Sequence, residues 1–293
     1  MSSANNAVLS VISEKLSELE GELNADLIFL KSPLVTPVDD HVRWAVEAIR
    51  PESDKKKLIV LLETDGGYVE VVERIVRVFR EHYEEVSFII PSHAYSAGTI
   101  LALSGDEIYM DYHSVLGPID PQHLINGSYL PGMGYLAKYK ELVEEINAAE
   151  DSALVRAQVT YLLAKFEPVT IFHIEQAIEH SKELLRDWLP KYKFKGWTKT
   201  KTRKKRVTDE MKKDRADDIA KILGRADYWH SHGRGIGILE LMGDEIKLEI
   251  VDYGKDLDLS SMIKSYYNLT VDYLQKNQIN NAIHSKSELR HIP

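Results

Sequence analysis

Hydrophobic positions follow two alternating patterns in the first half of the chain. The stretches "ADLIFL", "KKLIVLLE" and "EVSFII" are continuous apolar runs, which are typical of strands buried on both faces. Between them, segments such as "YVEVVERIVRVFREHY" repeat apolar residues every three or four positions, which is the period of an amphipathic helix. This alternation predicts an α/β fold with right-handed crossovers and a mostly parallel sheet covered by helices on both faces.

The remaining segments are mostly helical in pattern. Leu9, Ile12, Leu16, Leu19 and Leu23 form an N-terminal stripe that we expect to pack on its own domain or on a sister subunit. Residues 136–165 show a helical pattern without a breaker, and a further helix follows Pro168. The C-terminal part contains the helix "DDIAKILG", the strand-like "IKLEIVD" and the final helix "LSSMIKSYYNLTVDYL".

These changes in pattern predict four parts of the chain. Residues 1–25 form an N-terminal helix that is a candidate oligomer contact, and residues 26–190 form the α/β core. Residues 191–215 form a basic loop or linker, and residues 216–293 form a C-terminal α/β extension packed on the core. No internal repeat is visible.

Composition excludes several kinds of chemistry. The chain has no cysteine, so disulfides, thiolate nucleophiles and zinc ribbons are ruled out. The histidines show no H-x-x-x-H or H-E-x-x-H spacing, and no nucleotide-binding loop is present, so we expect no metal and no cofactor. No apolar run is long enough to cross a bilayer, and the N-terminus lacks the pattern of a signal peptide. We therefore expect a soluble, cytoplasmic protein.

Charge is distributed unevenly along the chain. The net charge of −9 argues against nucleic acid as the general partner. The segment from Lys191 to Arg215, however, carries twelve lysines or arginines against three acids. It is either a solvated loop or a docking patch for an acidic partner, RNA, DNA or an anionic membrane surface.

Two glycine-containing turns lie where ligand sites of parallel sheets are found. In "ETDGGYVE", Asp65, Gly66 and Gly67 end a buried strand and precede a helix, so backbone N–H groups can face a ligand closely. In "YSAGT", Ser96 lies between the next strand and a short helix. Both turns fall at the carboxyl ends of neighbouring strands. Each turn alone is typical of a plain strand-to-helix connection or an N-cap. Together they supply a nucleophile and the amide donors that an acyl-transfer site needs.

The same residues carry a resemblance to a known family. The stretches "LLETDGGYVEVVERI", "HAYSAGTILALSGDEIYMDYHSVLGPIDPQ" and "WHSHGRGI" resemble the serine dehydrogenase proteinase family. Its broader relatives are signal peptide peptidase A, archaeal membrane-protein-specific serine proteases and the Clp peptidases of the ClpP/crotonase superfamily. The resemblance covers roughly Leu27 to Ile250. It implies a ClpP/crotonase-like spiral of ββα units with C-terminal helical additions, and self-assembly into a homo-oligomer.

The resemblance also implies roles for individual residues. Ser96 matches the nucleophile, Gly67 and Ala97 match the oxyanion-hole amides, and Gly66 is a further candidate donor of the oxyanion hole. Tyr95 and Gly98, which flank the nucleophile turn, are candidates for contact with substrate.

The general base has several candidates. Clp-type peptidases carry a histidine after the strand that follows the nucleophile helix, and "YHSVLGPID" places Ile119 near that position. His93 and His123 flank Ser96 along the chain and are alternatives. The signal-peptide-peptidase branch uses a lysine on a later helix, where this sequence has Lys138 and Lys140. Both lysines lie about 100° from the apolar face of that helix, so helix phase does not separate them. We favour Lys138, because its distance from Ser96 along the chain resembles that in the archaeal relatives.

Three functions are consistent with these residues. The first is a serine endopeptidase that hydrolyses peptide bonds of a protein substrate with a Ser96–Lys138 dyad, without ATP unless a partner supplies it. The second is a crotonase-type enzyme that uses the same oxyanion hole on acyl-CoA. The third is an inactive scaffold or binding module, to which the basic segment would contribute. Nothing resembles a pyridoxal-phosphate or nicotinamide site, so serine dehydrogenase activity is not expected.

Overall fold

Seven strands form the central sheet in the computed structural model, which describes residues 3–125, 128–148, 152–200, 204–225, 229 and 234–293. Along the sheet the order is β10 (Val251–Asp252), β5 (Glu107–Met110), β3 (Glu85–Ile89), β2 (Lys57–Glu63), β1 (Asp26–Lys31), β11 (Ala282–His284) and β12 (Leu289–His291). The strands from β10 to β1 pair in parallel, whereas β11 runs antiparallel to β1 and β12 antiparallel to β11. The prediction of a mostly parallel α/β sheet is confirmed.

Alternate side chains of the central strands enter two separate cores. On β1, Ile28 and Leu30 face one core and Leu27 and Phe29 face the other, and all four are fully buried. This arrangement follows from the period of two in a strand. Continuous apolar runs are therefore what a sheet covered on both faces requires.

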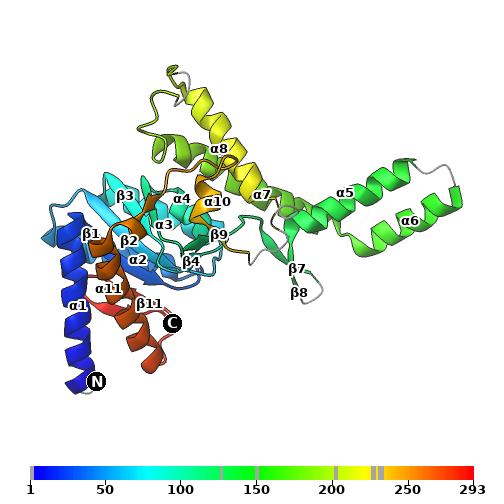
Figure 1. The fold of residues 1–293 in the computed structure, drawn as a ribbon. Coiled ribbons are helices and arrows are strands. Elements are labelled where there is room, and N and C mark those ends of the chain that lie inside the picture. Colours follow the sequence, from blue (N-terminus) through cyan, green and yellow to red (C-terminus); the bar gives the residue numbers. More distant parts are fainter. Residues whose placement is uncertain (1–2, 126–127, 149–151, 201–203, 226–228, 230–233) are drawn as a thin grey trace.

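Helices cover the two faces of this sheet. One face is covered by α1 (Ser3–Leu23) and α11 (Leu257–Lys276), which lie side by side (Figure 1). The N-terminal stripe packs here, since Ile12, Leu16 and Leu19 are fully buried in the core shared with α11. The opposite core is formed by α2 (Val38–Ile49), α3 (Val69–His82), α4 (Ala97–Leu103), α7 (Pro168–Lys191), α8 (Asp209–Leu223) and α10 (Ile238–Met242). Two 3₁₀ turns, η1 (Arg50–Glu52) and η2 (Tyr253–Lys255), follow α2 and precede α11 respectively.

Two smaller sheets lie near the carboxyl ends of the central strands. One has the order β4 (His93–Ala94), β6 (Val115–Leu116) and β9 (Ile236–Gly237), with β4 parallel and β9 antiparallel to β6. The other is an antiparallel hairpin of β7 (Gln122–Ile125) and β8 (Ser128–Pro131). The first of these sheets connects the nucleophile turn to the rest of the fold.

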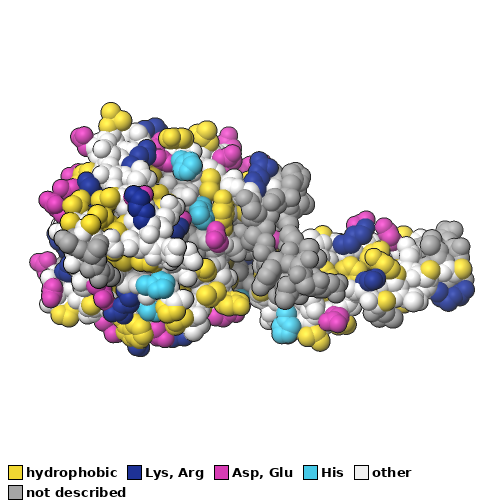
Figure 2. Space-filling model, turned by 90° about the horizontal axis from the view of Figure 1, so that it is seen from below, with side chains coloured by type: hydrophobic (Ala, Val, Ile, Leu, Met, Phe, Trp, Pro, Cys, Tyr) yellow, Lys and Arg dark blue, Asp and Glu magenta, His cyan; other side chains and the backbone are white. Residues whose placement is uncertain are grey.

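The region predicted as one helix from 136 to 165 forms two helices instead. The chain builds α5 (Gly132–Ala148) and α6 (Ser152–Lys165), which contact each other as an arm (Figure 1). Near its base, Tyr135 and Tyr139 pack on Phe166 with ring centroids 4.8 and 5.7 Å apart. In Figure 2 the arm projects away from the body. The sequence between α5 and α6 contains no proline or glycine. The helical period therefore gave no indication that this region forms two helices in contact with each other.

The C-terminal part also differs in detail from its pattern. The stretch "IKLEIVD" contributes only Val251 and Asp252 as strand β10. Its apolar residues Ile246, Leu248 and Ile250 are buried without further strand pairing. The basic segment includes the end of α7 and the start of α8, and between them Lys199 forms an isolated bridge with Arg206. Whether this segment binds an acidic partner or nucleic acid stays a prediction.

Candidate active site

Ser96 lies in a sharp turn at the start of α4. The chain reaches it from β4, which extends the end of β2: Thr64 N–H donates to His93 O at 3.1 Å, and Tyr95 N–H donates to Thr64 O at 2.9 Å. At Ser96 the backbone adopts φ +50° and ψ −118°, in a region that non-glycine residues rarely occupy. Such strain is held by the surrounding structure and is concentrated at functional turns. The Ser96 side chain is left only half-buried.

Gly66 packs directly against this serine. Its φ is +105°, and a Cβ added to it would lie 2.9 Å from both Ser96 Cβ and Tyr95 O. No other residue fits that distance, which real Cβ contacts essentially never show. The two glycine-containing turns that the sequence placed at neighbouring strand ends are therefore in contact.

The N–H of Gly67 points away from the chain segment at Leu34. Its neighbours pair with Leu34, because Leu34 N–H donates to Gly66 O at 2.8 Å and Tyr68 N–H donates to Leu34 O at 2.9 Å. In a parallel bridge of this kind the intervening residue directs its own N–H away from the partner strand. Gly67 is exposed, and a Cβ there would overlap the Leu34 carbonyl.

Two backbone amides remain unbonded around Ser96. Within the described part of the chain, neither Gly67 N–H nor Ala97 N–H makes a hydrogen bond. Ala97 is the first residue of α4, where N–H groups have no acceptor inside the helix. By contrast, Gly66 N–H donates to Thr64 Oγ1 at 3.1 Å. The donor role expected for Gly66 is therefore not available in this structure, and its place in the site is steric.

Thr99 holds three segments of the site together, and sequence reasoning missed it. Its hydroxyl lies 2.8 Å from Ala94 O and 2.9 Å from Gly117 O, and it accepts the Gly117 N–H at 2.9 Å. The side chain is fully buried. A Cβ on Gly117 would lie 3.3 Å from Ser96 N, so this contact keeps the "GPID" segment beside the nucleophile turn. The available signal was a threonine inside an otherwise apolar short helix.

Gly98 and Tyr95 line the turn on either side of Ser96. Gly98 is buried, and a Cβ there would overlap the methyl group of Thr64. Tyr95 is half-buried and stacks on the His93 ring at 4.8 Å. Contact of either residue with substrate stays a prediction.

His93 is already engaged by other side chains. Its Nε2 lies 3.0 Å from Asp65 Oδ1 and its Nδ1 lies 3.0 Å from Ser92 Oγ. Both ring nitrogens are thus occupied by groups other than Ser96. Ile119, at the position matched to the histidine of Clp peptidases, is buried and donates its N–H to Leu223 O at 3.0 Å.

The remaining base candidates lie on the hairpin and the arm. Lys138 and Lys140 are both exposed on α5, and α5 belongs to the arm that extends from the body (Figure 1). Lys138 Nζ donates to Glu141 Oε1 at 2.9 Å, and this hydrogen bond raises the pKa of Lys138 above its ordinary value. His123 belongs to β7, and its side chain lies outside the described part of the structure. No described base candidate is hydrogen-bonded to Ser96.

The motif "WHSHGRGI" borders the small sheet. Trp229 is buried and donates from Nε1 to Ile222 O at 2.8 Å, and β9 begins at Ile236. Residues 230–233 of the motif lie outside the described residues. Arg234 lies over the Trp229 ring at 5.8 Å, so the described part of the motif makes structural contacts.

A profile of the ClpP-like SDH-type serine proteinases matches residues 27–202, which includes both glycine-containing turns. The chain belongs to this family. The fold is accordingly of the ClpP type, and the family supports a serine peptidase.

Individual relatives are more distant. The chain is similar to two uncharacterized proteins of Methanocaldococcus jannaschii, at 25% identity over 205 residues and 39% over 77 residues. These matches span 70% and 26% of this chain but only 57% and 27% of the relatives. Among solved structures, it is similar to two variants of the 1510-N membrane-bound stomatin-specific protease, one of them in complex with a substrate peptide. These share 20% and 23% identity, each with a TM-score of 0.32. The matches cover 44% and 41% of this chain and 66% and 58% of those chains.

None of the described helices has the length and apolar content needed to cross a bilayer. The described residues also contain no group of three or more histidine, aspartate or glutamate side chains arranged to hold a metal ion.

Proposed function

We propose that this protein is a serine endopeptidase in which Ser96 is the nucleophile. The observation that carries the proposal is the contact between Gly66 and Ser96, together with the Gly67 and Ala97 amides of the two turns, which make no hydrogen bond within the described residues. A half-exposed serine in a strained turn is accessible to a substrate carbonyl, whereas a purely structural N-cap serine would bond its own helix. Ser96 makes no side-chain capping bond to α4.

The proposed reaction proceeds by acyl transfer. Ser96 Oγ attacks the peptide carbonyl carbon, and the carbonyl oxygen takes the negative charge. The N–H groups of Gly67 and Ala97 donate to that oxygen, and one such donor typically contributes ~3 kcal/mol of transition-state stabilisation. The C–N bond then breaks, the serine proton goes to the leaving amine through the base, and water releases the acyl group from Ser96.

We assign the base to Lys138 in the assembled enzyme. A lysine accepts a proton only when desolvation lowers its pKa toward neutrality. Lys138 is instead exposed and its ammonium form is stabilised by Glu141. The assignment therefore requires that Lys138 loses its contact with water and with Glu141 when a substrate or another subunit covers the arm.

Exposed apolar side chains support the proposed self-assembly. Val169 and Phe172 on α7 are 66% and 56% exposed, and Tyr161 on α6 is 53% exposed. Clusters of this kind on a surface commonly mark contact sites between proteins. A homo-oligomer that covers α6 and the start of α7 would also change the surroundings of Lys138.

The test combines cleavage with chemical labelling. Wild type, Ser96→Ala, Lys138→Ala and Lys276→Ala would be incubated with fluorescent casein and, separately, with a fluorophosphonate probe. Lys276 is the matched control, because it is an exposed lysine paired with Asp272 at 2.7 Å. We expect cleavage to fall by about 100-fold or more in the first two variants and to be unchanged in the control. Circular dichroism would verify that each variant is folded.

Each other outcome changes the assignment. Cleavage by Ser96→Ala would refute the nucleophile. If Lys138→Ala remains active, the same assay on Lys140→Ala, His93→Ala and His123→Ala identifies the base. Wild type that neither labels nor cleaves would favour a binding module over the peptidase, and thioesterase activity toward acyl-CoA without proteolysis would favour the crotonase-type reaction.

A further inference from the structure

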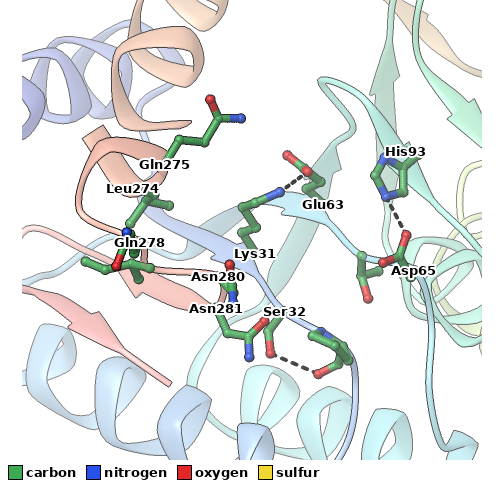
Figure 3. Close-up of a pocket in the computed structure, with 13 residues that line it drawn as sticks. Lys31, Ser32, Glu63, Asp65, His93, Leu274, Gln275, Gln278, Asn280 and Asn281 are labelled. Atoms are coloured by element: carbon green, nitrogen blue, oxygen red, sulfur yellow. Dashed lines mark hydrogen bonds and ion pairs between the residues drawn. The ribbon is translucent and has the colours of Figure 1, made fainter. Parts of the chain in front are cut away.

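A polar cavity lies beside the proposed active site. It has a volume of about 570 Å³ and opens at the carboxyl ends of β1 and β2, against the end of α11 and the loop that follows it. In Figure 3 the residues of α11 and its loop lie on one side, and Glu63, Asp65 and His93 lie on the other. Its volume falls within the range of pockets that bind small molecules or side chains.

Two residues of the cavity lining adjoin the nucleophile turn. Asp65 lines the cavity and is followed directly by Gly66, which touches Ser96. His93 lines it as well and stacks on Tyr95, the residue before Ser96. A peptide whose carbonyl group reaches Ser96 therefore passes the mouth of this cavity within a few residues.

The wall of the cavity contains an ion pair between Lys31 and Glu63. Lys31 Nζ donates to Glu63 Oε1, and Tyr267 OH donates to Glu63 Oε2 at 2.5 Å. Both carboxylate oxygens of Glu63 and the charge of Lys31 are thereby satisfied. Burial and the bond to Glu63 raise the pKa of Tyr267, so it remains a protonated donor.

Asp65 carries the negative charge that remains. With histidine counted as neutral, Lys31 and Glu63 cancel, and the lining keeps a formal charge of −1 on Asp65. Among the described residues, only its Oδ1 is engaged, by His93 at 3.0 Å, and the side chain is 83% exposed. Its second oxygen is directed to solvent or to a ligand.

The opposite wall supplies neutral hydrogen-bonding groups. It presents the amide side chains of Gln275, Gln278, Asn280 and Asn281. Within the described residues, none of these four side chains makes a hydrogen bond. Amide oxygens accept from cationic N–H groups without adding charge.

We propose that this cavity is a substrate subsite that binds the cationic side chain of an arginine or lysine in the cleaved peptide. The inference rests on the proposed peptidase function. A guanidinium or ammonium group offers only donors, and the cavity offers the Asp65 carboxylate and four amide oxygens as acceptors. An anionic side chain would meet Asp65 without a free cation, since Lys31 is paired with Glu63. An apolar side chain would leave these polar groups without partners, which costs free energy.

The test compares arginine with citrulline, which has nearly the same shape without the charge. Quenched fluorescent peptides would carry one or the other at each of the positions flanking the cleaved bond. In wild type we expect kcat/KM to be about three- to tenfold higher for arginine at a single position, as for a solvent-screened ion pair. The preference should shrink in 1 M NaCl, where charges are screened within about 3 Å.

The Asp65→Asn variant assigns the preference to this cavity. Its arginine-to-citrulline ratio should fall to about one, whereas the ratio should be retained in Asp244→Asn, which changes a fully exposed acid outside the lining. Any general loss of activity in a variant lowers kcat/KM for both peptides alike and therefore cancels in the ratio. The proposal would be overturned if wild type cleaved arginine and citrulline peptides with equal kcat/KM. It would also be overturned if Asp65→Asn left the arginine-to-citrulline ratio unchanged.

A binding measurement separates this proposal from the peptidase itself. Fluorescence anisotropy of the same peptide sequences, labelled with a fluorophore but without the quencher, can be measured with Ser96→Ala and requires no cleavage. Tighter binding of arginine peptides that is lost in Ser96→Ala/Asp65→Asn would support the subsite even if wild type were inactive. Equal binding of arginine and citrulline peptides would refute the subsite while cleavage by wild type still supported the peptidase.

Discussion

Replacing Gly66 with alanine tests the contact on which the site depends. The backbone at this position has φ +105°, which costs a non-glycine residue on the order of 1–3 kcal/mol. The new Cβ would lie 2.9 Å from Ser96 Cβ and from Tyr95 O, and overpacking of this kind costs about 1–3 kcal/mol more. We therefore expect Gly66→Ala to reduce the free energy of unfolding by about 2–5 kcal/mol.

The same substitution should affect the reactivity of Ser96. The clash is with backbone and with the Cβ of the nucleophile, so the turn at residues 95–97 has to move by a few tenths of an ångström. Because misplacement of a reacting group lowers rates steeply, fluorophosphonate labelling should slow by about tenfold or more in the fraction that remains folded. Labelling would be measured below the temperature at which the variant unfolds.

Gly21→Ala is the matched control. Gly21 lies in α1, and a Cβ added there meets nothing within 4 Å. This variant should be as stable as wild type or more stable by up to about 1 kcal/mol, because alanine is the better helix former. Urea unfolding followed by circular dichroism gives both free energies. If Gly66→Ala unfolds with wild-type stability and labels at the wild-type rate, the proposed contact between the two turns is wrong.

Three other changes have outcomes that follow from buried polar groups. Thr99→Val should reduce the free energy of unfolding, measured by urea denaturation, by about 2–4 kcal/mol, because Gly117 N–H loses its acceptor and the carbonyls of Ala94 and Gly117 lose the one hydroxyl hydrogen that lies within reach of both; wild-type stability would contradict the role of Thr99. Burial lowers the pKa of His284 to about 4, so above pH 6.5 the ring is neutral in both states, and stability should fall by about 3 kcal/mol from pH 6.5 to pH 4 as only the unfolded state takes up the proton. That part of the pH profile should be absent in His284→Gln. Lys31→Met leaves Glu63 buried with only Tyr267, and a loss of about 2–4 kcal/mol is expected, against almost none for Lys276→Met.

Local patterns were sufficient to predict the central layers. The continuous run at residues 58–62 is buried on both faces because alternate side chains of β2 enter the two cores that helices cover. The stripe from Ile12 to Leu19 is buried as its period indicated, although its partner is α11, some 240 residues later. A period of two or of 3.6 identifies which side of an element is buried, but it carries no information on what covers that side.

Some residues of the candidate site could be predicted from local patterns, and others could not. The positions of Ser96 and the Gly66–Gly67 turn follow from strand ends, and the structure brings them together. The general base could not be identified from the sequence, because the surroundings of each candidate depend on the folded chain. Lys138 lies on the arm and pairs with Glu141, and His93 is hydrogen-bonded to Asp65. Thr99 was missed because its function depends on Gly117, which only the folded chain brings near.

Pairing between β1 and β11 has a consequence for synthesis of the protein. Lys31 of β1 pairs with Ala282 of β11, so one of the two neighbours of β1 in the sheet lies about 250 residues later in the chain. During translation, β1 would leave the ribosome long before the strand that completes its edge. Until then one side of β1 stays unpaired, as does the face that α11 covers, and both are surfaces prone to aggregation. A nascent chain would thus carry Ser96 well before β11 pairs with β1 and the central sheet has all of its strands.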